Sequence, residues 1–255
     1  MALLEVNYRS VALSRNVTVQ VILPVDQRTA TDDYFTPRQF KTLYLLHGLH
    51  GNYADWNSNT RIRRWAEAQG LAVVMPSCDN SFYVDQSAAG NNYGEFVGRE
   101  LVEMTRRMFP LSYDREDTFI GGLSMGGFGA LRNGLKYYKT FGAIVSLSGA
   151  VDILHAPLFE SQRAFGEALF GPIEEARLSD KDPRVLIAQL KTVDKAMRPR
   201  IYLSCGTEDY LLPQNRTCRE LLTEAGFDLT YEEAPGNHTW DYWDTHIQKA
   251  IDWLL

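Results

Sequence analysis

Short, continuous apolar runs alternate with segments of helical spacing along most of this 255-residue chain. Runs of this kind are typical of strands that are buried on both faces of a parallel sheet. The segments between them end at a glycine or a proline, as at Gly70 and Pro110. The alternation predicts an α/β fold with a mostly parallel, twisted sheet of about eight strands and helices on both faces. The apolar runs lie at residues 43–46, 71–75, 118–120, 141–147 and 201–203.

The two ends of the chain extend this pattern. Valines recur at every second position over residues 17–21, and the pair 15–16 before them is typical of a turn. Together they predict an antiparallel hairpin at one edge of the sheet. The polar stretch 26–39 is expected to be a loop. Near the end of the chain, residues 229–232 alternate as a strand and residues 242–254 have the spacing of an amphipathic helix.

One region interrupts the alternation. Residues 151–197 contain several large apolar side chains but no strand pattern. We interpret this region as a small cap-like insertion over the carboxyl edge of the sheet. The rest of the chain shows no repeat and no linker, so a single domain over residues 1–255 is expected, a length that suits one large core.

The composition is that of an ordinary globular protein, with 45% apolar and 23% charged residues. The formal net charge of −6 argues against nucleic-acid binding, which needs a clustered basic surface. No apolar run approaches the ~20 residues of a membrane span, so no membrane partner is expected. The first residues lack the basic and apolar segments of a secretory signal, and there are only three cysteines. These features predict free thiols and a cytoplasmic location.

The segment Gly122-Leu123-Ser124-Met125-Gly126 carries the strongest local signal for chemistry. It matches the G-x-S-x-G pattern, in which a serine sits on a sharp turn between a strand and a helix. An apolar run precedes it and a helix rich in small residues follows it, as the pattern requires. The sequence therefore predicts that Ser124 is a nucleophile.

A serine hydroxyl needs an adjacent base, and hydrolases with this pattern place an acid and then a histidine after the serine. His238 lies in a loop between a strand and the last helix, which is the expected place for the base, whereas His246 lies within that helix. The acid should follow a late strand, and Glu208 and Asp209 both do so. Asp152, which follows an earlier strand, is a weaker candidate. Spacing alone does not decide between Glu208 and Asp209.

A serine that attacks a carbonyl group also needs two backbone N–H donors for the negative charge that develops on the carbonyl oxygen. One is expected from Met125, directly after the serine, and the other from Leu49, in the loop after the run 43–46. In the same loop, His47 is expected to brace the backbone rather than to react, and His50 has no assigned role.

Five aromatic residues lie on or near loops that should converge on the serine, and they are candidates for the wall of a substrate pocket. They are Trp56, Phe82, Tyr83, Tyr93 and Trp240. The five histidines show no ligand spacing with cysteines or carboxylates, so neither a metal nor another cofactor is expected.

Several motifs, in the same order along the chain, resemble the esterase D-like branch of the α/β-hydrolases, and most closely the bacterial tributyrin esterases. The resemblance implies the α/β-hydrolase fold, Asp209 as the acid, and Leu49 and Met125 as the oxyanion donors. The matching segments are 44–52 (YLLHGLHGN), 74–76 (VMP), 118–127 (TFIGGLSMGG), 205–211 (CGTEDYL) and 236–240 (GNHTW).

The resemblance further implies a serine carboxylesterase that acts on a small-molecule ester through a Ser-His-Asp triad and an acyl-enzyme intermediate. The small cap favours short acyl groups. The same branch is similar to S-formylglutathione hydrolases and to feruloyl and acetylxylan esterases, which are the alternatives within enzymes. A binding protein with this fold but no activity is disfavoured because all three triad residues are present. The sequence is compatible with a homo-oligomer.

Overall fold

The computed structural model describes residues 1–26, 38–86, 90–156 and 162–255. These residues form an eight-stranded sheet in the order β1-β2-β4-β3-β7-β8-β9-β10. The strands pair in parallel from β4 to β10, and only β1 with β2 and β2 with β4 pair antiparallel. The predicted sheet is therefore confirmed. The strands are β1 (Ala2–Ser10), β2 (Arg15–Leu23), β3 (Thr42–Leu46), β4 (Ala72–Pro76), β7 (Thr118–Leu123), β8 (Ala143–Leu147), β9 (Arg200–Gly206) and β10 (Leu229–Ala234).

The first two strands form the predicted hairpin, but its turn lies earlier than expected. Ser10 pairs with Arg15, so the turn comprises residues 11–14 and Arg15 already belongs to β2. The carboxylate of Glu100 accepts the backbone N–H groups of Val11 (3.0 Å) and Ala12 (2.6 Å). This contact from a distant helix fixes the turn, and local sequence cannot show it. The loop predicted at 26–39 falls largely on residues 27–37, which lie outside the described residues.

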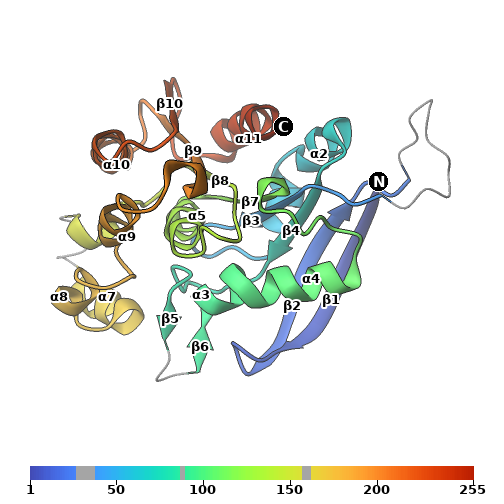
Figure 1. Ribbon diagram of the computed structural model, residues 1–255, viewed down its shortest axis with the longest axis horizontal. Coiled ribbons are helices and arrows are strands. Elements are labelled where there is room, and N and C mark those ends of the chain that lie inside the picture. The colour runs from blue at the N-terminus through green and yellow to red at the C-terminus, as the bar shows by residue number, and fades with distance from the viewer. Residues whose placement is uncertain (27–37, 87–89, 157–161) are drawn as a thin grey trace.

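Helices cover both faces of the sheet (Figure 1). One face carries α2 (Ile62–Gln69) and α11 (Trp240–Leu254), which pack against each other. The other face carries α4 (Leu101–Met108), α5 (Met125–Lys136) and α10 (Leu212–Glu224). The core is accordingly split by the sheet into two apolar layers, and strands β3, β4, β7 and β8 are buried at every position. This double burial explains why the strands appear in the sequence as unbroken apolar runs.

Short elements complete the described chain. A π-helical segment, Phe96–Glu100, joins α3 (Tyr93–Glu95) to α4, so the helical segment that ends before Pro110 is continuous but not uniform. Helix α10 begins at Leu212, and Pro213 is accommodated in its first turn. The remaining elements are α1 (Asp55–Asn59), β5 (Asp85–Gln86), β6 (Asn91–Asn92), α3 (Tyr93–Glu95) and the 3₁₀ turn Arg115–Asp117.

In its described residues, the region predicted as a cap contains helices and turns but no strand; residues 157–161 of it lie outside the described part. It is tied to α5 by Arg132, whose fully buried side chain donates to the backbone carbonyl of Asp180 at 2.8 Å and pairs with its carboxylate at 3.0 Å. This region therefore rests on the helix that follows Ser124. Its elements are Ile153–His155, α7 (Arg163–Phe170), α8 (Ile173–Ala176), α9 (Pro183–Leu190) and Lys195–Met197.

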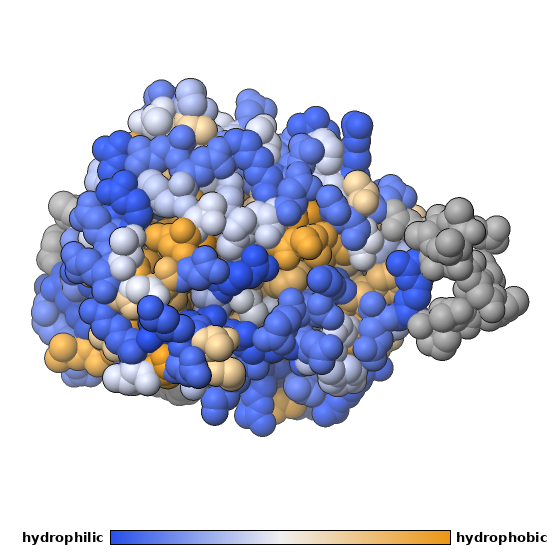
Figure 2. All heavy atoms as spheres, turned by 45° about the horizontal axis from the view of Figure 1, so that its top comes forward, coloured by the Kyte–Doolittle hydropathy of each residue, from blue (hydrophilic) through white to orange (hydrophobic). Residues whose placement is uncertain are grey.

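The surface in Figure 2 is covered mostly by hydrophilic side chains, with apolar side chains gathered in small patches between them. Within the described residues, no helix combines the length and the apolar character needed to cross a bilayer.

Candidate active site

Ser124 lies at the sharp turn between the end of β7 and the start of α5. Its backbone has φ 53° and ψ −118°, a conformation that L residues rarely adopt and that signals strain at a functional position. The strain is held by close backbone packing. A Cβ atom at Gly126 would lie less than 3.0 Å from the carbonyl oxygens of Leu46 and His47, and one at Gly122 would lie equally close to the carbonyl of Gly126. Strands β3 and β7 and helix α5 thus meet without side chains between them.

His238 and Asp209 complete a hydrogen-bonded line with this serine. His238 Nε2 lies 3.0 Å from Ser124 Oγ, and His238 Nδ1 lies 2.8 Å from Asp209 Oδ2. The other carboxylate oxygen of Asp209 accepts the backbone N–H of Leu211 at 2.9 Å. Burial alone would raise the pKa of Asp209, but these hydrogen bonds outweigh it and hold that pKa below its usual value. An ionised carboxylate only accepts, so Nδ1 carries the ring proton and Nε2 is free to take one from the serine.

Glu208, the alternative that local sequence left open, lies elsewhere. Its carboxylate accepts the backbone N–H of Gly236 and the hydroxyl of Thr207, and its side chain is exposed to solvent. It braces the loop that carries His238 without contacting the ring. Asp152 does not contact His238 either, because its carboxylate forms a bidentate ion pair with the guanidinium of Arg184, with both N–O distances at 2.7 Å.

The loop after β3 is braced by His47. Burial lowers the pKa of His47, which keeps the ring neutral. Its Nε2 accepts the backbone N–H of Cys78 at 2.9 Å, so Nδ1 is the protonated nitrogen and donates to the carbonyl of Gly48 at 2.7 Å. The hydroxyl of Tyr83 donates to the carbonyl of His47 at 2.8 Å. Within the described chain, no protein acceptor takes the backbone N–H of Leu49 in this loop.

Like the N–H of Leu49, the backbone N–H of Met125, the first residue of α5, has no protein acceptor among the described residues. Leu49 and Met125 both line a cavity that Ser124 also lines, and no protein acceptor among the described residues keeps either N–H from a ligand there. His50 has a positive φ of 66°, and its own N–H is bonded to the side chain of Asn80 at 2.7 Å. His50 therefore cannot offer that N–H to the same ligand.

In the described part of the chain, Ser124 lines two hollows, and both are also lined by Leu49 and Tyr210. The larger, of about 380 Å³, we call the His238 hollow; its further walls are His50, Asp55, His238, Trp240 and Trp243. The smaller, of about 80 Å³, we call the Met125 hollow; its further walls include Phe82, Met125, Ala150, Ile153, Phe165 and Leu211.

The five aromatic residues expected in the pocket divide into two groups. Phe82 and Trp240 line the hollows. Trp56, Tyr83 and Tyr93 do not, which corrects the expectation for these three. Trp56 is buried behind Trp240, with ring centroids 5.5 Å apart, and its indole N–H donates to the carbonyl of Leu46 at 3.0 Å. Tyr83 lies beneath the loop after β3, and the hydroxyl of Tyr93 bonds to Asp79 at 2.5 Å. Their polar tips are used to hold loops together.

Sequence reasoning missed Tyr210, Trp243 and Asp55. Tyr210 directly follows the acid and lies 4.8 Å from the ring of His238, centroid to centroid. Trp243 packs edge-on against the same ring at 4.9 Å. The position of Tyr210 beside Asp209 was a usable signal, whereas Trp243 looked like one more apolar residue of an amphipathic helix. In the described part of the chain, no group of three or more His, Cys, Asp or Glu side chains is placed to hold a metal ion.

Comparisons with known proteins give matches over nearly the whole chain. Residues 10–254 match the family model described as a putative esterase. The chain is 42% identical to an acetyl esterase of Caldicellulosiruptor saccharolyticus, over all of this chain and 98% of that protein. It superimposes on the fluorophosphonate-binding serine hydrolase F of Staphylococcus aureus with a TM-score of 0.87 and 31% identity, covering 99% of this chain and 98% of that one. An S-formylglutathione hydrolase of the same organism gives a TM-score of 0.84 and 30% identity at the same coverage.

The backbone contact at the turn gives a stability prediction. Gly126→Ala should lower the free energy of unfolding by about 1–3 kcal/mol or more, because its Cβ would meet carbonyl oxygens that cannot move aside. Gly121→Ala is the matched control. It lies in the same strand–turn segment, but its Cβ would lie 3.2 Å from Val145 Cβ and 3.3 Å from Leu43 Cδ1, contacts that need a shift of only a few tenths of an ångström. Denaturant unfolding of both variants measures the difference; equal costs would contradict the close-contact explanation.

Proposed function

The chain belongs to the esterase family and is a serine ester hydrolase with the α/β-hydrolase fold, and we propose that it hydrolyses short-chain acyl esters through Ser124, His238 and Asp209. The observation that carries this proposal is the unbroken hydrogen-bonded line from Ser124 Oγ through His238 to the buried carboxylate of Asp209.

The proposed reaction proceeds through an acyl-enzyme. As Ser124 Oγ bonds to the ester carbonyl carbon, His238 Nε2 takes the serine proton, and Asp209 stabilises the resulting imidazolium. The negative oxygen of the tetrahedral intermediate accepts the N–H groups of Leu49 and Met125. The intermediate collapses by breaking the bond to the alcohol oxygen, which receives the proton from His238. Water then attacks the acyl-enzyme as His238 Nε2 takes a proton from it. The bond to Ser124 Oγ breaks, this oxygen receives the proton from His238, and the acid product is released.

The two hollows support an assignment of the two parts of the ester. The alcohol oxygen must receive a proton from His238, so the alcohol belongs in the hollow that this histidine lines, and the acyl group belongs in the Met125 hollow.

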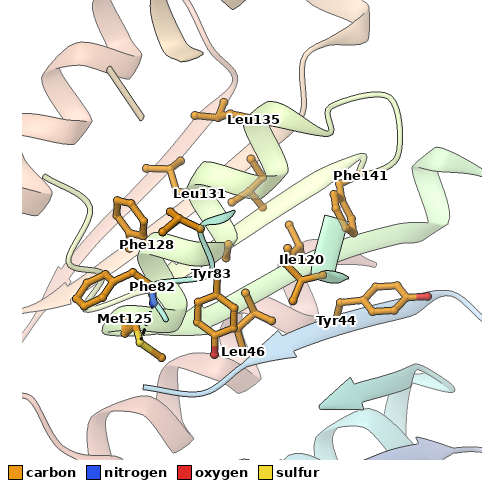
Figure 3. Close-up of a cluster of buried hydrophobic side chains, with 14 of the residues drawn as sticks. Tyr44, Leu46, Phe82, Tyr83, Ile120, Met125, Phe128, Leu131, Leu135 and Phe141 are labelled. Atoms are coloured by element: carbon orange, nitrogen blue, oxygen red, sulfur yellow. Dashed lines mark hydrogen bonds between the residues drawn. The ribbon is translucent and has the colours of Figure 1, made fainter. Parts of the chain in front are cut away.

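The Met125 hollow is small, and its inner wall is made of buried residues such as Phe82 and Met125. Figure 3 shows Phe82 against Met125 and Phe128; the ring centroids of Phe82 and Phe128 lie 5.7 Å apart. Phe170 of α7 packs on Phe82 at 5.4 Å. This aromatic cluster supports a preference for short acyl groups and argues against a bulky feruloyl group.

An S-formylglutathione hydrolase is the second candidate, because the chain is similar to one in fold and sequence. A formyl group fits any acyl hollow. Glutathione as the leaving group is a poorer match, because its two carboxylates outnumber its single ammonium group, and the described wall of the His238 hollow contains Asp55 but no Lys or Arg. This charge opposition places the carboxylesterase first.

We also infer a reducing, cytoplasmic location. Cys78, Cys205 and Cys218 are all free and buried, and burial raises the pKa of Cys205 to about 12. Buried thiols of this kind suit a compartment in which disulfides do not form. Recovery of the protein mainly from the medium of its native host would contradict the inference.

The acyl-chain preference is tested with p-nitrophenyl esters of increasing chain length. Acetyl to butyryl esters should give the highest kcat/KM, and octanoyl and longer esters should be cleaved at least about tenfold more slowly because the aromatic cluster closes the Met125 hollow. S-formylglutathione and a feruloyl ester belong in the same series. A kcat/KM that climbs steadily to long chains, or that peaks on S-formylglutathione, would overturn the proposed preference.

Ser124→Ala should reduce kcat by about three orders of magnitude or more, because no neighbouring group can form the covalent intermediate. A fluorophosphonate probe should label the wild-type protein and leave this variant unlabelled. Circular dichroism of the variant checks that it is folded. Activity within about tenfold of wild type would show that another residue is the nucleophile.

Asp209→Asn and Glu208→Gln form a matched pair of amide substitutions. Asp209→Asn removes the charge that fixes the His238 tautomer, and in a comparable triad such a change lowers kcat by about 10⁴. Glu208→Gln should lower kcat by no more than about tenfold, because the amide oxygen can still accept the N–H of Gly236. Steady-state kinetics on p-nitrophenyl acetate compares them. If Glu208→Gln lowers kcat by orders of magnitude while Asp209→Asn has nearly the wild-type kcat, the acid is Glu208 and not Asp209.

A further inference from the structure

The His238 hollow has aromatic walls that are held rigidly. Trp240 packs edge-on against the buried ring of Trp56 at 5.5 Å and against Trp243 at 5.1 Å. Trp243 packs in turn on His238, and Tyr210 lies on the same imidazole from another side. The indole and phenol rings therefore surround the place where the leaving alcohol must receive its proton. Faces of Trp and Tyr attract cations through the negative face of the ring.

One acidic residue lines the same hollow. Asp55, in the first turn of α1, is half buried, and its Oδ2 lies so close to Gly51 that a Cβ there would collide with it. Gly51 belongs to the loop that follows β3, so this carboxylate lies beside the loop that carries Leu49. Among the described residues, the Asp55 carboxylate forms no ion pair and accepts no side-chain or backbone hydrogen bond. By contrast, Asp79, Asp152 and Asp244 each pair with an arginine.

The His238 hollow has an acidic residue in its wall but no basic one among the described residues. No Lys or Arg is among the described residues that line it, and Asp55 is its only carboxylate. An unpaired carboxylate beside aromatic faces is the combination that recognises an ammonium group, since the ion pair and the ring attraction act on the same cation. A neutral polyhydroxylated alcohol would instead need several donors and acceptors facing it.

We propose that the His238 hollow selects esters whose alcohol carries an ammonium group, with Asp55 as the counter-charge and Tyr210, Trp240 and Trp243 as the aromatic walls. The inference rests on the proposed function, because it places the alcohol on the His238 side of Ser124. Asp55 acts here as a specificity-determining residue. The hollow, at about 380 Å³, has room for a small branched ammonium such as choline.

The test compares two acetate esters of nearly the same shape, the ester of choline and that of its uncharged carbon isostere, 3,3-dimethylbutanol. At low ionic strength and mildly alkaline pH, wild-type kcat/KM should favour the choline ester by about tenfold. Asp55→Asn should reduce the ratio of the two kcat/KM values to about two. The ratio is the decisive readout: if Asp55 merely supported the neighbouring loop, both esters would be slowed equally and the ratio would stay unchanged.

Asp228→Asn is the matched control for net charge. Asp228 is exposed and directly precedes β10, so it lies at the amino edge of the sheet, opposite the active site. The Asp228→Asn variant should keep the wild-type ratio of kcat/KM for the two acetate esters. If both alkyl esters are cleaved too slowly, competitive inhibition of p-nitrophenyl acetate hydrolysis by choline and by 3,3-dimethylbutanol gives the same comparison.

The possible outcomes separate the two proposals. Equal rates on the two esters, a preference that survives Asp55→Asn, or a loss of preference in Asp228→Asn would overturn the cation selectivity while leaving the esterase intact. Faster cleavage of a monosaccharide acetate than of the choline ester would likewise overturn it in favour of hydroxyl recognition. Absence of hydrolysis of every ester, p-nitrophenyl acetate included, would overturn the proposed function itself.

Discussion

The contact between the backbones of β3, β7 and α5 is the constraint on which the rest of the site depends. Because Gly122 and Gly126 have no side chains, the two strands and the helix approach until carbonyl oxygens face Cα atoms. That approach holds Ser124 at φ 53° and lifts it above the carboxyl edge of the sheet. It also brings the N-terminus of α5 and the loop after β3 to the same point. The proposed nucleophile and the two proposed oxyanion donors are therefore positioned by one packing contact.

The second constraint is electrostatic. Asp209 is buried, and burial disfavours a charge, yet its carboxylate stays ionised because both oxygens accept hydrogen bonds. The charge in turn decides which nitrogen of His238 carries the proton. Tyr210 and Trp243 restrict the same ring by packing, so orientation and tautomer are set by different neighbours. Glu208, one residue away, stabilises the loop rather than the ring.

Local patterns predicted most of the fold and the order of the site residues. Strands buried on both faces have unbroken apolar runs, and the turn at Ser124 needs glycines at fixed positions, so both leave a signal in the sequence. Contacts between distant segments leave none. The hairpin turn is held by Glu100 from another element, and this contact moved the turn away from the predicted pair 15–16. Spacing likewise could not choose Asp209 over Glu208; the resemblance to a known family did so.

The aromatic residues show the same limit at the level of side chains. Phe82 and Tyr83 are neighbours in one loop, and both have a positive φ. One ring lines the Met125 hollow, while the other lies beneath the loop after β3 with its hydroxyl on His47. Which of two adjacent rings faces a cavity depends on backbone conformation, and periodicity carries no information about it in an irregular loop. Trp243 was missed because it looked like one more apolar residue of an amphipathic helix, and Asp55 was missed because no motif includes it.

Tyr210 forms a wall shared by both hollows. A protein with separate acyl and alcohol pockets could change its preference for one half of the ester without altering the other. Here any substitution at this position reshapes both at once, and it also removes a ring from His238. Mutations on the two sides of Ser124 are therefore coupled through a common neighbour, so their effects on selectivity are expected to be non-additive. Evolution of a new substrate range in this scaffold would have to keep Tyr210 and work through the outer walls, or change acid and alcohol specificity together.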